Sequence, residues 1–321
     1  MNFRSKVLGT VLGGAIALMA ASPVMAASID ARDMLKTFNS VVLNSFTVQS
    51  GGHVHGRTFV GNDLTSVGDL NLDQVENTTL NGLSGTLFVG DDILVPANQS
   101  KLLKGNAQVG DNVSGNFQTN NGTLSSGVSG IPVTEVLQAF ESLSQELAGF
   151  ASTGGTAHLS DNNDLRFTSA AGADNVAVFN LTAAEFNSTF GNGNPATYKG
   201  VTATAGVTTI INVAGTNLTY NANGAGAINP SVIFNFYEAE TLFIGNNLST
   251  SVLAPFANMS ITKDLKGTVV AEDLTLSAQI VGPLYDGNIP PTTVVPVPAA
   301  AYLLLTGIAA IGGMAARRRK A

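Results

Sequence analysis

The first candidates for catalysis or metal binding are three histidines, His53, His55 and His158. His53 and His55 flank Val54, so in a strand both imidazoles would point to the same face and could begin a metal site. Two imidazoles without a third ligand are better explained as a solvated strand face. The sequence has no cysteine and no G-x-S-x-G motif around a serine, so nothing in it indicates nucleophilic catalysis.

Carboxylates raise a second possibility, a calcium site, because calcium binds six to eight oxygen atoms. No EF-hand loop or glycine-rich nonapeptide array surrounds them, and Asp is common in turns. We therefore expect turns and no cofactor, with a structural calcium ion as the alternative. The residues concerned are Asp91, Asp92, Asp111, Asp161 and Asp164.

Acid–base chemistry on a polysaccharide would need two of the carboxylates to meet in a groove. Sugar-processing sites also use Arg, Lys and aromatic side chains, whereas this chain has no tryptophan and few cations. We expect a protein that is not an enzyme, and the spatial arrangement of the carboxylates tests this expectation. The candidates are Asp91, Asp92, Asp111, Glu238, Glu240, Glu272 and Asp273.

The elements that carry these residues are predicted to be mainly β. Only 12% of the residues are charged, and Gly, Asn, Ser and Thr are abundant. A unit of a short strand, a Gly-Asn/Asp turn and an apolar residue recurs at 56–64, 85–93 and 105–113, with a shorter copy at 267–274. This spacing favours a β-solenoid, similar to a right-handed parallel β-helix, over a β-sandwich.

One segment breaks the β pattern and predicts an amphipathic helix near residues 132–151, packed on the β body. A shorter helix is expected from Ala31 to Phe38, with Met34, Leu35 and Phe38 inward. Strands are expected at 175–181, 201–213 and 218–220. The apolar side of the longer helix is predicted to comprise Val133, Leu137, Phe140, Ser144, Leu147 and Ala151.

Both ends of the chain predict export. Residues 1–26 combine Arg4 and Lys6, an apolar run and the small residues that signal peptidase recognises, so cleavage is expected between Ala26 and Ala27. The apolar run is about 15 residues, shorter than the roughly 20 that span a bilayer.

The other end predicts a transient inner-membrane tether. An extended spacer at 291–298 precedes an apolar stretch at 299–316, which as a helix would be about 27 Å long. A basic tail at 317–321 is expected to stay in the cytoplasm. The sorting residues would be Pro296, Val297 and Pro298, followed by Arg317, Arg318, Arg319 and Lys320.

The segment between the processing points, 27–290, is expected to form one acidic domain. It holds nine basic and 22 acidic residues, a net charge of −13. Nucleic acid is excluded as a partner, because phosphate binding requires clustered Lys and Arg. With no cysteine, stability must come from the apolar core rather than from disulfides.

The tail resembles the PEP-CTERM sorting signal, which implies processing by an exosortase in a Gram-negative bacterium; Val297 stands where that signal has glutamate. Residues 29–290 resemble the choice-of-anchor A family of adhesive domains, which implies a surface-displayed β-helix without catalytic residues. The blocks that carry this resemblance are 38–42, 55–62, 143–148, 211–213, 232–236, 252–257, 267–271 and 282–290.

We therefore expect an adhesive or biofilm-matrix protein at the cell surface or outside the cell, which contacts an extracellular polymer or a cell-surface ligand. Residues 253–255 and 267–271 are also similar to the closing coils of ice-binding β-solenoids, which is the first alternative. A Thr-rich region with Thr202, Thr204, Thr208 and Thr209 favours it, although no regular T-x-T ladder is visible across coils. A carbohydrate-active β-helix enzyme is the second alternative.

Overall fold

A computed structural model of the chain describes residues 29–67, 77–102, 104–191, 196–224 and 226–291. The predicted signal peptide, its cleavage site at Ala26 and Ala27, and the sorting tail from Pro296 onward lie outside these residues. Within the described ranges, no helix is long and apolar enough to cross a bilayer.

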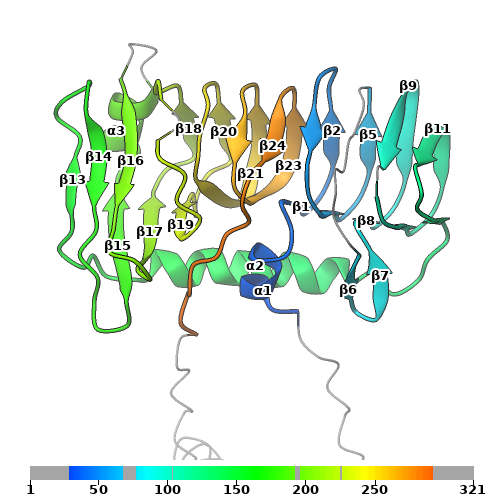
Figure 1. Ribbon diagram of the computed structural model, residues 1–321, viewed down its shortest axis with the longest axis horizontal. Helices are drawn as coiled ribbons and strands as arrows, with labels where there is room; N and C mark the ends of the chain where they lie inside the picture. The colour runs from blue at the N-terminus through cyan, green and yellow to red at the C-terminus, as the bar shows by residue number, and fades with distance from the viewer. Residues whose placement is uncertain (1–28, 68–76, 103, 192–195, 225, 292–321) are drawn as a thin grey trace, which may run out of the picture.

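The described chain forms a parallel β-solenoid, which confirms the predicted fold class (Figure 1). Each coil contributes a strand to a face that α2 covers, which we call the helix face. In spatial order its strands are β15 (Val176–Leu181), β17 (Thr208–Val213), β19 (Val232–Asn235), β21 (Ser251–Ile261), β23 (Val269–Leu276), β1 (Ser40–Val42), β4 (Thr58–Val60), β8 (Leu87–Val89), β10 (Ala107–Val109) and β12 (Leu124–Ser125).

A second face, which we call the open face, contains eight strands, all parallel. It is built by β18 (Asn217–Tyr220), β20 (Thr241–Ile244), the later halves of β21 and β23, β2 (Phe46–Val48), β5 (Leu64–Ser66), β9 (Ile93–Leu102) and β11 (Val113–Thr119).

Smaller sheets complete the structure. A third side of the central coils consists of β22 (Leu265–Lys266), β24 (Gln279–Val281) and β3 (His53–Val54). The end of the solenoid at β15 carries β13 (Thr156–His158), β14 (Leu165–Thr168) and β16 (Tyr198–Thr202), with α3 (Ala183–Phe186) and the π-helical turn η1 (Asn187–Gly191). A hairpin of β6 (Thr78–Leu80) and β7 (Leu83–Gly85) projects near the other end.

The order of coils in space differs from their order in the chain. The chain enters the middle of the solenoid at β1 and winds to β12 at one end. Helix α2 (Val133–Ala148) then runs back along the solenoid, and the chain winds from β15 to β23 (Figure 1). There Ser40 of β1 pairs with Val269 on one side and with Thr58 on the other. The first and last coils are therefore neighbours, and α2 makes this arrangement possible.

The repeat predicted from sequence is confirmed residue by residue. Phe59 pairs with Phe88, and Val89 pairs with Val109, so equivalent repeat positions stack. A Cβ on Gly90 would collide with the carbonyl oxygen of Gly61, and glycine is therefore required at this turn position because neighbouring coils approach so closely there.

The long helix is confirmed at Val133–Ala148, but its buried side differs in part from the prediction. Phe140, Ser144 and Leu147 are buried as expected. Val133 and Leu137 are half-buried, and Ala151 is exposed because the helix has already ended. The prediction missed two buried residues, Val136 and Leu143.

The short helix α1 (Ala31–Leu35) is confirmed but ends before the predicted Phe38, and Met34, Leu35 and Phe38 are buried against the helix face. Strand predictions hold for β15 and β18. The predicted single strand over 201–213 is wrong: β16 ends at Thr202 and β17 begins at Thr208, with Gly206 at a φ of +81° in the turn between them.

Candidate functional site

The open face is a regular surface of eight parallel strands on the side of the solenoid that α2 does not cover. In β2, Phe46 and Val48 are buried in the solenoid while Thr47 lies between them on the outside. In β20, Leu242 and Ile244 are buried while Thr241 and Phe243 are exposed. This alternation places every second side chain on the outer surface.

Hydrogen-bonded register brings one outward side chain from each strand into a line, which we call the outer row. Six of its eight members carry a hydroxyl group, and none is charged. With strands about 4.8 Å apart, the row is about 34 Å long. From β18 to β11 it comprises Thr219, Phe243, Ser260, Thr275, Thr47, Thr65, Leu94 and Ser114.

A second line, two residues earlier on each strand, follows the turns between the two faces, and we call it the turn row. Its carboxylates join adjacent coils: Oδ1 of Asp63 accepts a hydrogen bond from the backbone N–H of Asp92 at 3.2 Å, and Oδ1 of Asp92 accepts one from that of Asn112 at 2.8 Å. These bonds fix the turn of each coil on the next. The row comprises Asn217, Thr241, Asn258, Asp273, Ser45, Asp63, Asp92 and Asn112.

The same kind of hydrogen bond joins β23 to the turn before β2, where the last coil meets the first. Oδ1 of Asp273 accepts a hydrogen bond from the backbone N–H of Ser45 at 3.0 Å and another from Nδ2 of Asn44 at 2.8 Å. The side chains that flank the outer row are thus held by backbone hydrogen bonds. These bonds help to hold in register the strands that carry the outer row.

Comparison with known proteins places this architecture in a family. The family profile described as "Putative Ice-binding-like adhesive domain" matches residues 31–281. The chain belongs to this family. Among solved structures, the crystal structure of an ice binding protein from an Antarctic Biological Consortium matches with 13% identity and a TM-score of 0.29, over 88% of this chain and 97% of that one. No curated protein sequence matches the chain.

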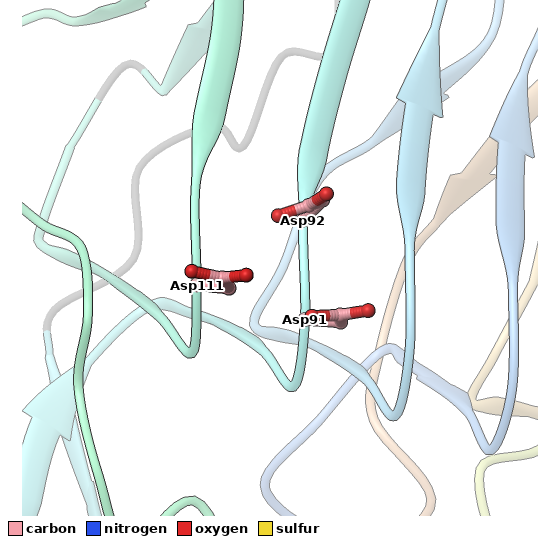
Figure 2. A group of neighbouring side chains, drawn as sticks. All are labelled: Asp91, Asp92 and Asp111. Carbon is pink, nitrogen blue, oxygen red and sulfur yellow. The ribbon is translucent and has the colours of Figure 1, made fainter.

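In this ice-binding-like adhesive domain, three of the carboxylates that were considered as calcium ligands come together. Asp91 and Asp92 precede β9, and Asp111 lies on the neighbouring turn before β11 (Figure 2). One carboxylate oxygen from each lies within 4.8 Å of the others, and Asp91 and Asp111 are exposed. Partial desolvation, followed by the charges of Asp92, Asp63 and Asp111, raises the pKa of the Asp91 carboxyl.

In the acidic cluster of the adhesive domain, Asp92 also takes part in the turn structure. If each carboxylate offers one oxygen, the cluster supplies three of the six to eight oxygen atoms that calcium binds. One oxygen of Asp92 already accepts the backbone hydrogen bond of Asn112, as Asp63 does for Asp92. The other two carboxylates that were considered for calcium lie elsewhere: Asp164 pairs with Arg166, and Asp161 accepts a hydrogen bond from the backbone of Asn163.

Another candidate carboxylate, Glu272, lies on the same ridge of the adhesive domain as Asp91 but on a distant coil. Backbone bonds run from Asn44 to Glu272, from Asn62 to Asn44 and from Asp91 to Asn62, so Glu272 and Asp91 are three coils apart. Three coils correspond to about 14 Å. Paired glycosidase carboxyls lie about 5 to 9.5 Å apart. Asp273 binds Ser45, and Glu238 accepts a hydrogen bond from the backbone of Gly215.

The predicted histidine pair of this domain lies on the third side of the solenoid. His53 pairs with Gln279, and Val54 is buried while both histidines are half-exposed, as the alternation predicts. In the part of the chain that the structure describes, no third His, Cys, Asp or Glu joins them as a metal ligand.

Sequence reasoning missed the outer row and chose the wrong threonines. Thr208 and Thr209 are buried in β17 on the helix face, while Thr202 and Thr204 lie at the turn that separates β16 from β17. The available signal was a hydroxyl residue between two buried apolar residues, as in Phe46-Thr47-Val48. That pattern recurs in Leu274-Thr275-Leu276 and Met259-Ser260-Ile261.

Proposed function

We propose that this protein is an exported adhesive or biofilm-matrix protein that contacts an extended extracellular polymer or cell-surface ligand through its open face. The observation that carries the proposal is the outer row, a line of aligned, uncharged side chains over eight parallel strands. In this proposal the domain acts by contact, without catalysis.

A rigid flat surface suits an extended ligand because little conformational entropy is lost when such a surface binds. Thr47, Thr65 and Thr275 can donate and accept hydrogen bonds with hydroxyl-rich polymers. Phe243, which is 40% exposed, adds an aromatic surface on which a sugar ring can stack. Together they support a carbohydrate chain as the ligand class.

Charge narrows that class to ligands that are not polyanionic. Neither the outer row nor the turn row contains a Lys or Arg, and Asp63, Asp92 and Asp273 make the border of the face acidic. Acidic groups repel phosphate and uronate polymers. We therefore favour an uncharged polymer and continue to exclude nucleic acid.

The proposal includes the export and processing steps that are expected from the sequence. Signal peptidase would cleave between Ala26 and Ala27, and an exosortase-like enzyme would process the tail at Pro296 to Pro298 after transient tethering in the inner membrane. Membership of the choice-of-anchor A group and a PEP-CTERM-like tail belong to this proposal. Membership of an adhesive family supports a final location at the cell surface or outside the cell.

Gene deletion in the native bacterium tests the adhesive role. Loss of the protein should weaken biofilm cohesion or surface attachment, and the intact gene should restore it. Mass spectrometry of the mature protein from the surface and medium fractions supplies the control, since it shows both cleavage points. Confirmed secretion together with unchanged attachment and cohesion would refute the proposal.

Ice binding is a second candidate, and the repeated hydroxyls of the outer row favour it. Hydroxyl groups at strand spacing on a flat face provide a regular array for ordered water. Phe243 and Leu94 interrupt the array, which makes this candidate weaker than polymer contact. Thermal hysteresis of the purified protein decides between them: its absence removes ice binding.

A further inference from the structure

Phe243, on β20, is the aromatic residue of the outer row. Its side chain is 40% exposed, and every other aromatic residue that the structure describes is buried or half-buried. Single exposed apolar side chains are common on protein surfaces and need no function. Whether Phe243 has a function therefore depends on what surrounds its ring.

Short, uncharged polar side chains flank Phe243 on both neighbouring strands. Phe243 pairs with Thr219 of β18 and with Ser260 of β21 (Figure 1). A backbone hydrogen bond from Gly245 to Tyr220 continues the pairing past the end of β20. The phenyl ring is thus the one large outward side chain in this part of the open face. The six residues that flank it are Asn217, Thr219 and Asn221 on one side, and Asn258, Ser260 and Thr262 on the other.

Gly245 leaves room for the ring to lean along the strand. A Cβ at this position would collide with Cε1 of Phe243 and with the amide oxygen of Asn221. Gly245 is not one of the glycines with a positive φ, so its backbone conformation does not require glycine. The space above its Cα is what requires it, because the ring and the amide oxygen meet there. A glycine in a sheet often marks such a close approach.

The polar groups around the ring are held in place. Oγ1 of Thr241 donates a hydrogen bond to Oδ1 of Asn217 at 2.8 Å, and Nδ2 of Asn221 donates one to the carbonyl oxygen of Gly191 at 3.3 Å. In the described part of the chain, no group donates a hydrogen bond to Oδ1 of Asn221. This oxygen, beside the ring of Phe243, is therefore free to accept one from a ligand.

An apolar ring inside a polar perimeter matches the surface of a sugar. A pyranose whose hydroxyl groups all lie near the plane of the ring has C–H groups on its faces and hydroxyl groups around its edge. Its face can stack on an aromatic ring while its edge reaches amide and hydroxyl groups. Every residue of a β-linked glucose chain has this form, and the chain is extended, as the outer row is.

We propose that Phe243, Asn221 and Gly245 form a subsite for one ring of an uncharged β-linked glucose chain. The sugar stacks on Phe243 and one of its hydroxyl groups donates a hydrogen bond to Oδ1 of Asn221. Gly245 is a positioning residue, since it sets the tilt of the phenyl ring. The subsite rests on the proposed function: it places one sugar near the β18 end of the outer row, and the hydroxyl groups from Ser260 onward contact the sugars that follow.

Titration calorimetry of the purified protein with cellohexaose tests the stacking. Phe243→Ala should weaken binding about tenfold or more, whereas Phe243→Tyr, which keeps a ring face, should stay within about threefold of the parent. The matched control is Ile228→Ala, which removes a 51% exposed apolar side chain outside the open face and should change nothing. In protein with labelled phenylalanine, the Phe243 ring signals should shift on addition of cellohexaose.

Gly245→Ala tests the positioning role. The atoms that its Cβ would meet belong to two side chains, which can move, so we expect an unchanged melting temperature. The displaced ring should show altered NMR signals in the free protein, and cellohexaose binding should weaken about threefold or more. Because Gly245 acts through the ring, Gly245→Ala should add no further loss to Phe243→Ala. Independent, additive losses would contradict this role.

The outcomes separate the subsite from the function of the open face. A parent that does not bind cellohexaose overturns the subsite, and so does a Phe243→Ala variant that binds it as tightly as the parent does. Insoluble cellulose then shows whether the open face still binds. Loss of cellulose binding in Thr47→Lys/Thr275→Lys, with full binding in Phe243→Ala, would overturn the subsite while the proposed function stands. Full cellulose binding by both variants would overturn both.

Discussion

The side-chain amide of Asn235 donates a hydrogen bond to the amide oxygen of Asn212 at 2.9 Å, and both side chains are buried between α2 and the helix face. Asn212 donates in turn to Asn180 and to the carbonyl oxygen of Leu147, each at 2.8 Å. Hydroxyl Oγ of Ser144 donates to Asn235 at 2.6 Å. This ladder explains how a helix that crosses several coils keeps its register on them.

Asn235→Ala should strongly destabilise the protein, because the amide oxygen of Asn212 and the hydroxyl group of Ser144 lose the hydrogen bonds that they make with Asn235. We expect a loss of about 3 kcal/mol in the free energy of unfolding, given roughly 1 to 3 kcal/mol for each unsatisfied polar group. Chemical denaturation measures it. Asn258→Ala, on the exposed side of β21, is the matched control and should change stability by less than about 0.5 kcal/mol.

Gly90→Ala should test the close approach of the coils. Its Cβ would collide with the carbonyl oxygen of Gly61, so we expect a loss of about 2 kcal/mol or more from forced backbone movement. Gly82→Ala is the comparison, because Gly82 has open space around it but a φ of +80°. It should cost only about 1 kcal/mol. Equal effects of both substitutions would contradict the packing explanation.

Asp91→Asn should stabilise the protein at neutral pH. The folded protein holds the Asp91 proton more tightly than the unfolded chain does, so the ionised carboxylate opposes folding, and its unfavourable contribution fades as the pH falls through the raised pKa. Thermal unfolding of both proteins from pH 7 to pH 3 measures this. The difference should vanish near pH 3, below the ordinary Asp pKa of about 3.9. A lower melting temperature for Asp91→Asn at pH 7 would contradict the assignment.

Local patterns in the sequence predicted much of the fold. The Gly-Asn/Asp repeats gave the pairing of β4, β8 and β10, because each coil repeats the same turn requirement. Three-residue and four-residue apolar spacing gave α2, although Val136 and Leu143 were missed on its buried side. In these cases the structural cause lies within one coil or one helix, where a single sequence can display it.

The open face was not predictable in the same way, because its cause is long-range. Thr47 and Thr275 are neighbours only because α2 lets the chain return to β1. Spacing along the outer row is also irregular: 18 residues separate Thr47 from Thr65, and 29 separate Thr65 from Leu94. No fixed period marks the row in the sequence. The sequence-based prediction of a hydroxyl-rich surface therefore relied on the clustered threonines at 202–209 instead.

Binding of the purified protein to insoluble, uncharged polysaccharide tests the central claim most directly. The double variant Thr47→Lys/Thr275→Lys changes the middle of the outer row, where both side chains point outward and the fold should tolerate them. The matched control is Thr204→Lys, exposed away from the open face, paired with Ala205→Lys so that both proteins gain two charges. We predict that the control binds like the parent, whereas the outer-row variant binds about tenfold more weakly or worse, a loss of about 1.4 kcal/mol. Equal binding by all three proteins, with the fold intact, would contradict the claim that this protein works through its open face.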